Sequence, residues 1–257
     1  MRVTTQMFWL PKEGNSVAEY EDAFWPNEAA DTLPLNGFCC AIADGATETS
    51  FSGAWANLLT RHWCSGNGDL AQFLAVLPAL QAQWGSEVES VAMPWYAEEK
   101  ARAGAFSSLL GLRLFDVIPD NDWPARWEAV AVGDSCLFQI RADIAVAFPL
   151  SRAAEFNNSP YLLSTVSQSV EDVNEHLIIL GGKCYPGDVF YLMTDALACW
   201  FLRRHEEGQE IVGSLFDLDA HEKFQRVVEG QRAGKDTDGR PYLRNDDVTL
   251  YRVEIHE

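Results

Sequence analysis

The chain has 257 residues, of which 47% are hydrophobic and 22% charged, a balance typical of a globular protein with a sizeable core. It carries 38 Asp and Glu against 19 Lys and Arg, so the formal net charge is −19. Such an acidic surface repels nucleic-acid phosphates and anionic lipids, and we therefore expect neither nucleic acid nor a membrane as a partner. The acidity is either a solubility device or, in part, a means of attracting divalent cations.

Apolar, β-branched and aromatic runs bounded by Gly, Asp and Pro predict strands. In chain order the predicted strands cover residues 38–43, 127–131, 136–141, 144–148, 189–194 and 248–255. Apolar residues at helical spacing predict helices in the intervening sequence. The predicted helices cover residues 52–63, 70–84, 95–115, 196–204 and 221–231.

Strands and helices do not alternate regularly in this order. The pattern therefore favours sheets packed on each other with helices outside, rather than a doubly wound parallel sheet. No linker or internal repeat divides the chain, and we expect a single domain over residues 1–257. Residues 150–175 lack clear periodicity and predict a long surface loop or flap, either functional or inert.

The cysteines and the N-terminus bear on the compartment. None of the six cysteines belongs to a CxxC pair, and most lie in apolar stretches such as GFCCAIAD, which argues against a zinc site or a disulfide framework. The N-terminal apolar run is too short for a signal peptide, and no stretch approaches the ~20 apolar residues of a membrane span. We expect a cytoplasmic protein.

Four segments share one design, an apolar strand that ends in a carboxylate beside small or turn-forming residues. They are AIADGAT with Asp44 and Gly45, VAVGDS with Gly133 and Asp134, DVFYLMTDAL with Asp195, and RNDDVTLYRV with Asp246 and Asp247. Taken singly, each aspartate is explained as well by a turn or a helix N-cap. Strand ends are also rigid platforms from which carboxylates can converge, and hard divalent cations need such oxygen ligands.

Convergence of these carboxylates would have a large electrostatic cost. Two carboxylates ~5 Å apart repel by roughly 3 kcal/mol at an effective dielectric constant near 20. Summed over the pairs that four carboxylates form, the repulsion rivals the ~5–15 kcal/mol net stability of a domain. If these side chains meet, cations must bind or protons must be taken up.

Five short motifs occur in a fixed order along the chain. They are Glu21-Asp22, Asp44-Gly45, Gly133-Asp134-Ser135, Thr194-Asp195 and Asp246-Asp247-Val248-Thr249. Together they resemble the E-D, D-G, G-D-S, (S/T)-D-G and D-(N/D)-x-T motifs of the PPM-type (type 2C) metal-dependent protein phosphatases, and they span nearly the whole chain. The resemblance implies an α+β fold, a four-layer α-β-β-α sandwich of two antiparallel sheets flanked by helices.

The same resemblance implies a function. The protein would be a Mg²⁺- or Mn²⁺-dependent phosphomonoester hydrolase that removes phosphate from serine or threonine of a phosphorylated protein substrate, using a metal-activated bridging water. Two ions would bind, and many members hold a third. Asp44 would bridge the two ions, Asp22 would orient coordinated water, and Asp134 would serve the third ion. The implied catalytic residues are Asp44, Asp195, Asp246 and Asp22. The implied metal ligands are Glu21, Asp44, Gly45, Asp134, Asp195 and Asp246.

The chain departs from the family at the substrate phosphate. Val17 stands where members usually carry a phosphate-binding Arg, whose planar fork suits phosphate. Further departures are Ala46, Cys136 and Ala196, where a His (in animal members), an Arg and a Gly are usual. Candidate replacements for the missing cation are Lys12, Arg61 and Arg2. Two alternatives stay open: a catalytically weak or inactive phosphatase-fold regulator that binds a phosphoprotein, and an unrelated acidic domain whose aspartates are turns and caps.

Overall fold

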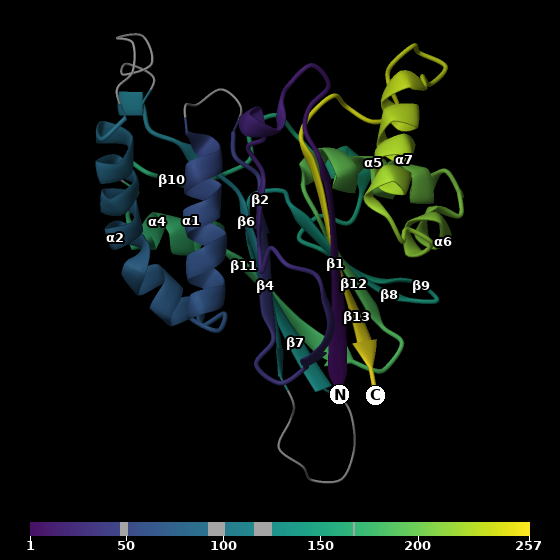
Figure 1. Ribbon diagram of the computed structural model, residues 1–257, viewed down its shortest axis with the longest axis horizontal. Helices are drawn as coiled ribbons and strands as arrows, with labels where there is room; N and C mark the ends of the chain where they lie inside the picture. The colour runs from purple at the N-terminus through teal and green to yellow at the C-terminus, as the bar shows by residue number, and fades with distance from the viewer. Residues whose placement is uncertain (47–50, 92–100, 116–124, 167) are drawn as a thin grey trace.

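A computed structural model describes residues 1–46, 51–91, 101–115, 125–166 and 168–257. Two antiparallel sheets lie face to face, and helices cover their outer faces (Figure 1). The four-layer α-β-β-α sandwich that the motifs imply is thus confirmed.

The first sheet has the strand order β3-β1-β13-β12-β8-β9, with every neighbouring pair antiparallel. Its strands are β1 (Arg2–Leu10), β3 (Ala30–Pro34), β8 (Cys136–Arg141), β9 (Asp143–Phe148), β12 (Val189–Met193) and β13 (Val248–His256). In the register of β1 and β13, Arg2 lies opposite His256 and Leu10 opposite Val248. The start of β13 therefore lies at the end of the sandwich away from both termini (Figure 1).

The second sheet has the order β11-β7-β6-β4-β2 and is also antiparallel. Its strands are β2 (Ala23–Trp25), β4 (Cys39–Ala43), β6 (Leu109–Phe115), β7 (Ala125–Val132) and β11 (Ile178–Cys184). A short separate pair joins β5 (Phe106–Ser107) to β10 (Leu163–Ser164).

Helices α1 (Ser52–Ser65) and α2 (Leu70–Glu89) lie on the side of the second sheet, where α1 packs on β4 and β2. On the first sheet, α5 packs on β13 and α7 on β1. The remaining helical segments are η1 (Val17–Glu19), η2 (Ala153–Glu155), α4 (Val170–His176), α5 (Asp195–Glu206), α6 (Ile211–Phe216) and α7 (His221–Ala233). Among the described residues, no helix combines the length and apolar character needed to cross a membrane.

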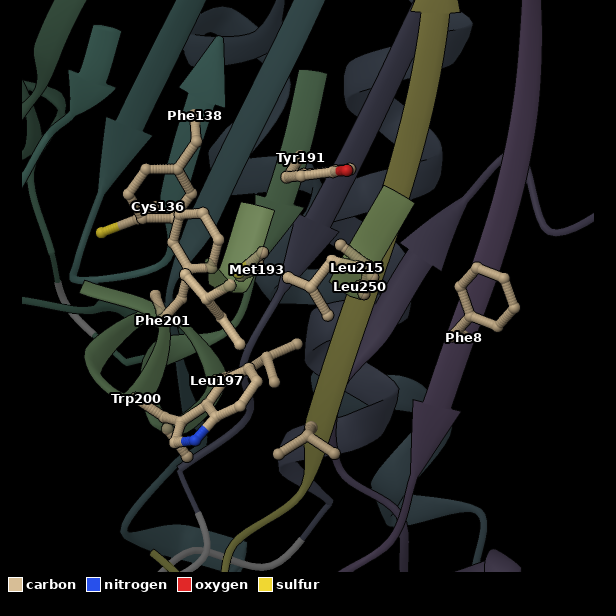
Figure 2. Packing of buried hydrophobic residues seen from close by; sticks show 14 of the residues in the cluster. Phe8, Cys136, Phe138, Tyr191, Met193, Leu197, Trp200, Phe201, Leu215 and Leu250 are labelled. Carbon is tan, nitrogen blue, oxygen red and sulfur yellow. The ribbon is translucent and has the colours of Figure 1, made fainter. Parts of the chain in front are cut away.

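The buried core fixes these layers relative to one another. One apolar cluster fills the space between the sheets. A second lies between the first sheet and its helices, and a third lies between the second sheet and its helices. Under α5, the Phe138 and Phe201 ring centroids are 4.7 Å apart, and Tyr191 meets Phe201 edge-on at 6.3 Å (Figure 2). This packing holds α5 against the sheet, and the first residue of α5, Asp195, is a candidate ligand.

The helix predicted over residues 95–115 is wrong in its second half. Residues 106–115 contain β5 and β6, while residues 95–100 lie outside the described part of the chain. Most of β6 is buried and its sequence, LLGLRLF, is apolar except for Arg113, so periodicity cannot separate it from a buried helix. The predicted loop over residues 150–175 is also partly wrong, because η2, β10 and the first turns of α4 interrupt it.

The other predicted strands and helices are confirmed with small shifts of their ends. Besides β5, β6 and β10, the described part of the chain contains four strands that were not predicted: β1, β2, β3 and β11. None of the four shows the strict alternation of buried and exposed positions that marks a strand in a sequence.

Candidate active site

Four of the predicted aspartates line one pocket of about 540 Å³. Asp44 directly follows β4, Asp134 lies in the turn between β7 and β8, Asp195 is the first residue of α5, and Asp246 lies two residues before β13. The two sheets thus bring together, at one end of the sandwich, side chains that are far apart in the sequence.

Two motif glycines permit the close approach of these segments. A Cβ atom on Gly45 would lie 2.7 Å from the backbone oxygen of Glu21. Gly133 has φ +101°, and a Cβ atom there would lie 2.6 Å from the Cβ of Ser108. A side chain at either position would therefore push apart the segments that carry Asp44 and Asp134.

Ser108 connects two of the motifs and was not predicted. The Asp44 backbone N–H donates to Ser108 Oγ at 3.0 Å, and the Ser108 N–H donates to the Asp44 carbonyl at 2.9 Å. Ser108 Oγ also lies 2.8 Å from Ser135 Oγ, so it links the D-G segment to the G-D-S turn. No pattern in the sequence indicates this role, because Ser108 lies within the helix predicted over residues 95–115.

The pocket carboxylates shift one another's protonation. Burial raises the pKa of Asp44 well above its ordinary value, and the neighbouring charge of Asp195 adds to the effect. Burial, and then Asp195, likewise raise the pKa of Asp134 to about 7. The same two causes, in the same order, raise the pKa of Asp246. The repulsion expected of converging carboxylates is therefore present in this pocket.

One cation, Arg244, lies among these carboxylates and was not predicted as part of the site. Its Nη2 donates to Asp195 Oδ2 and lies 3.0 Å from Asp246 Oδ2. Burial alone would lower the pKa of the guanidinium, but the charges of Asp195 and Asp246 outweigh it and raise that pKa. The signal in the sequence was only its position, two residues before Asp246.

Asp22 lies outside the pocket lining, where it is 3% exposed. Its Oδ2 accepts hydrogen bonds from Thr194 Oγ1 at 2.9 Å and Thr249 Oγ1 at 2.7 Å, so the two motif threonines fix its position. Burial is the largest cause that raises its pKa. Among the described residues, its Oδ1 has no hydrogen-bond partner.

Glu21 also lies outside the pocket lining, next to the Asp44-Gly45 segment. Its Oε1 accepts a hydrogen bond from Ser52 Oγ at 2.5 Å. Asp247 accepts the backbone N–H of Glu21 at 2.6 Å and that of Lys12 at 2.7 Å, which ties this segment to the start of β13. The second aspartate of the last motif therefore has a structural role.

The residues present suit a divalent cation. They supply several carboxylate oxygens, the donors that Mg²⁺ and Mn²⁺ prefer. The buried Oδ1 of Asp195 lacks a hydrogen-bond partner among the described residues. Within that part of the chain, no three His, Cys, Asp or Glu side chains stand at the spacing of a formed metal site. The carboxylates would have to close in, and Arg244 would have to leave Asp195 and Asp246, before an ion could bind between them.

Comparison with known proteins gives the fold. No protein-family model and no curated protein sequence matches the chain. Among solved structures, the photosystem II phosphatase PBCP is 14% identical, with a TM-score of 0.61 and coverage of 98% of both chains. The catalytic domain of the serine/threonine protein phosphatase PstP, in complex with two manganese ions, is 15% identical, with a TM-score of 0.58 and coverage of 99% of this chain and 100% of that one.

A third similar structure is PppA, a regulatory component of the T6SS in Pseudomonas aeruginosa. It is 15% identical, with a TM-score of 0.57 and coverage of 99% of this chain and 98% of that one. The chain therefore has the fold of the PPM-type serine/threonine phosphatases, and the resemblance seen in the motifs is confirmed at the level of the fold.

Proposed function

We propose that this protein is a Mg²⁺- or Mn²⁺-dependent phosphomonoester hydrolase that acts on phosphoserine or phosphothreonine in proteins, with residues 1–257 as one catalytic domain. One observation carries the proposal: four aspartates from four separate strand ends line a single pocket. Burial, and then the charge of Asp195, raise the pKa values of the other three. The phosphatase fold and the two manganese ions of PstP support it.

In this proposal Asp44, Asp134, Asp195 and Asp246 hold the ions, with Glu21 and the carbonyl of Gly45 beside them. Bound ions would supply a Lewis acid that lowers the pKa of water and offsets the negative charge of the phosphoryl oxygens.

The chain's own residues supply the positioning. Asp22, fixed through Oδ2 by two threonine hydroxyls, keeps Oδ1 available to orient a water. Ser108 keeps Asp44 in place through the backbone. The segment that follows η2 contributes one part of the pocket wall, and this gives the predicted flap a role in substrate contact. Its lining residues are Asn157, Asn158, Ser159, Pro160 and Leu162.

A second candidate is a fold-preserving regulator that binds a phosphoprotein without hydrolysing it. The observation that favours it is Val17, which is 66% exposed on η1 where the phosphate-binding Arg of the family is usual. A valine there offers no donor to a phosphate.

The test is turnover of p-nitrophenyl phosphate and of a phosphopeptide panel in the presence of Mn²⁺ or Mg²⁺. We expect turnover that a chelator abolishes and that Asp195→Asn removes, while the exposed control Asp238→Asn behaves as the wild type. Binding of phosphopeptides with no turnover under any divalent metal would favour the regulator. Turnover that continues at the same rate in the presence of a chelator would contradict the metal-dependent proposal.

A further inference from the structure

Arg244 is the one cationic side chain among the described residues that line the pocket. Its side chain is 53% exposed, whereas those of its partners Asp195 and Asp246 are 15% and 28% exposed. The guanidinium thus lies at the mouth of the carboxylate cluster, where an incoming anion would meet it first.

The guanidinium has unused donors. Both of its ion pairs are made through Nη2, and no hydrogen bond of Nη1 or Nε is found among the described residues. A guanidinium carries five N–H donors in a planar fork, which matches two oxygens of a phosphate. Arg244 could therefore bind a phosphoryl group with donors that the carboxylates do not occupy.

The cations considered from the sequence do not line this pocket, although Lys12 is near enough for its charge to oppose the rise in the pKa of Asp246. Arg61 stacks on the Trp25 ring, with its guanidinium carbon 4.7 Å from the ring centroid. Lys12 lines a separate pocket beside Arg232. Arg2 begins β1, whose nine residues place it roughly 27 Å from the other end of that strand. None of the three lines the aspartate pocket.

We propose that Arg244 binds the phosphoryl group of the substrate, so that the loop before β13 supplies the guanidinium that Val17 cannot. This inference rests on the proposed function, because it takes the pocket as a phosphomonoester site. Without ions, Arg244 pairs with Asp195 and Asp246 and offsets part of their charge. A divalent cation would compete for the same oxygens and release the guanidinium toward the phosphate.

The test compares Arg244→Gln and Arg244→Lys with the wild type and with Arg240→Gln, a charge-matched control on an exposed residue of the same loop. Calorimetry measures the affinity for inorganic phosphate in saturating Mg²⁺ and, separately, the affinity for Mn²⁺ alone. Steady-state kinetics with p-nitrophenyl phosphate gives KM and kcat.

Loss of a charge-assisted hydrogen-bonded pair predicts that Arg244→Gln weakens phosphate binding and raises KM by about 10–100-fold. Mn²⁺ binding should become tighter, because the internal competitor is gone. Arg244→Lys keeps the charge without the fork and should recover part of the phosphate affinity. Arg240→Gln should match the wild type. If Arg244→Gln fails to fold by circular dichroism, the phosphate affinity of Arg244→Lys decides.

The outcomes separate this inference from the proposed function. A wild type that binds phosphate through Arg244 but does not hydrolyse supports the inference and contradicts the proposed function. A wild type that hydrolyses, with phosphate affinity and KM unchanged in Arg244→Gln, overturns the inference alone. A change in Mn²⁺ affinity or thermal stability without any change in phosphate binding makes Arg244 purely structural and also overturns it. A wild type that binds no phosphate overturns it as well.

Discussion

The aspartates at the two ends of β12, Asp188 and Asp195, have different surroundings. Asp188, just before β12, is 1% exposed and fully satisfied: Arg141 donates to it through Nε and Nη2, each at 2.7 Å, and Gln139 Nε2 donates at 2.8 Å. The Tyr185 backbone N–H adds a fourth hydrogen bond at 3.0 Å. At the other end of β12, Asp195 shares its pocket with three further aspartates and a single arginine.

The two regions differ in how completely their carboxylates are paired within the protein. A buried carboxylate with an arginine fork and two further donors needs nothing from solution. The pocket has more negative charge than Arg244 can offset, and burial, followed by the charge of Asp195, raises the pKa values of Asp44 and Asp134. The ion pair at Asp188 stabilises the fold. The aspartate pocket contains unfavourable repulsion between carboxylates, which a bound cation would reduce.

The largest expected effect is on activity, from Asp44→Asn. The change keeps the shape but removes a proposed ligand, and losing several kcal/mol of transition-state stabilisation predicts a drop in kcat of about 1000-fold or more. The metal-free variant should melt at a higher temperature than the wild type, because one member of the repelling set becomes neutral. Stopped assays measure kcat, and a thermal melt without metal measures the melting temperature. An Asp44→Asn variant with unchanged kcat and unchanged melting temperature would contradict the proposed role of Asp44.

Asp188→Asn should show the opposite pattern. It leaves the Arg141 guanidinium without its carboxylate, and we expect the free energy of unfolding to fall by about 2–4 kcal/mol. Urea unfolding measures this loss, and kcat with Mn²⁺ should stay at the wild-type value. Lost activity in a folded Asp188→Asn protein would mean that the two regions are coupled.

Thr249→Val tests the support of Asp22. The valine keeps the shape but removes the hydroxyl that donates to Asp22 Oδ2. Groups that orient a metal site are typically worth about 10–100-fold in affinity or activity, and we expect a loss of that size in kcat. Thr60→Val is the matched control, because the buried Thr60 hydroxyl donates to backbone oxygens within α1. Equal activity of the two variants would remove Asp22 from the mechanism.

The smallest expected effect is on pH dependence. Asp134 has an ordinary pKa of 3.8 and a folded pKa of about 7, so unfolding releases its proton between these values. The metal-free protein should therefore lose stability as the pH rises from about 4 to 7, and Asp134→Asn should flatten that decline. Thermal midpoints in a chelator at pH 5, 6, 7 and 8 measure it. A rising midpoint over this range would contradict the raised pKa.

The order of strands and helices, together with the resemblance to the PPM-type motifs, predicted the layered sandwich. The gathering of Asp44, Asp134, Asp195 and Asp246 was predictable because strand ends followed by carboxylates form a local pattern. It could not predict Arg244 or Ser108, whose roles come from tertiary contacts and leave no spacing to detect. The buried strand β6 reads as helix in the sequence, because a buried apolar run has no strict alternation of apolar and polar residues.

The most direct measurement is a Mn²⁺ titration followed by calorimetry and thermal unfolding of the wild type, Asp44→Asn and Asp188→Asn. If the pocket binds cations, Mn²⁺ at 100 times its Kd should stabilise the wild type by about 2.7 kcal/mol. Asp188→Asn should gain the same increment from its lower starting point, and Asp44→Asn should gain little. No heat of binding and no change in midpoint for the wild type at millimolar Mn²⁺ would contradict the account.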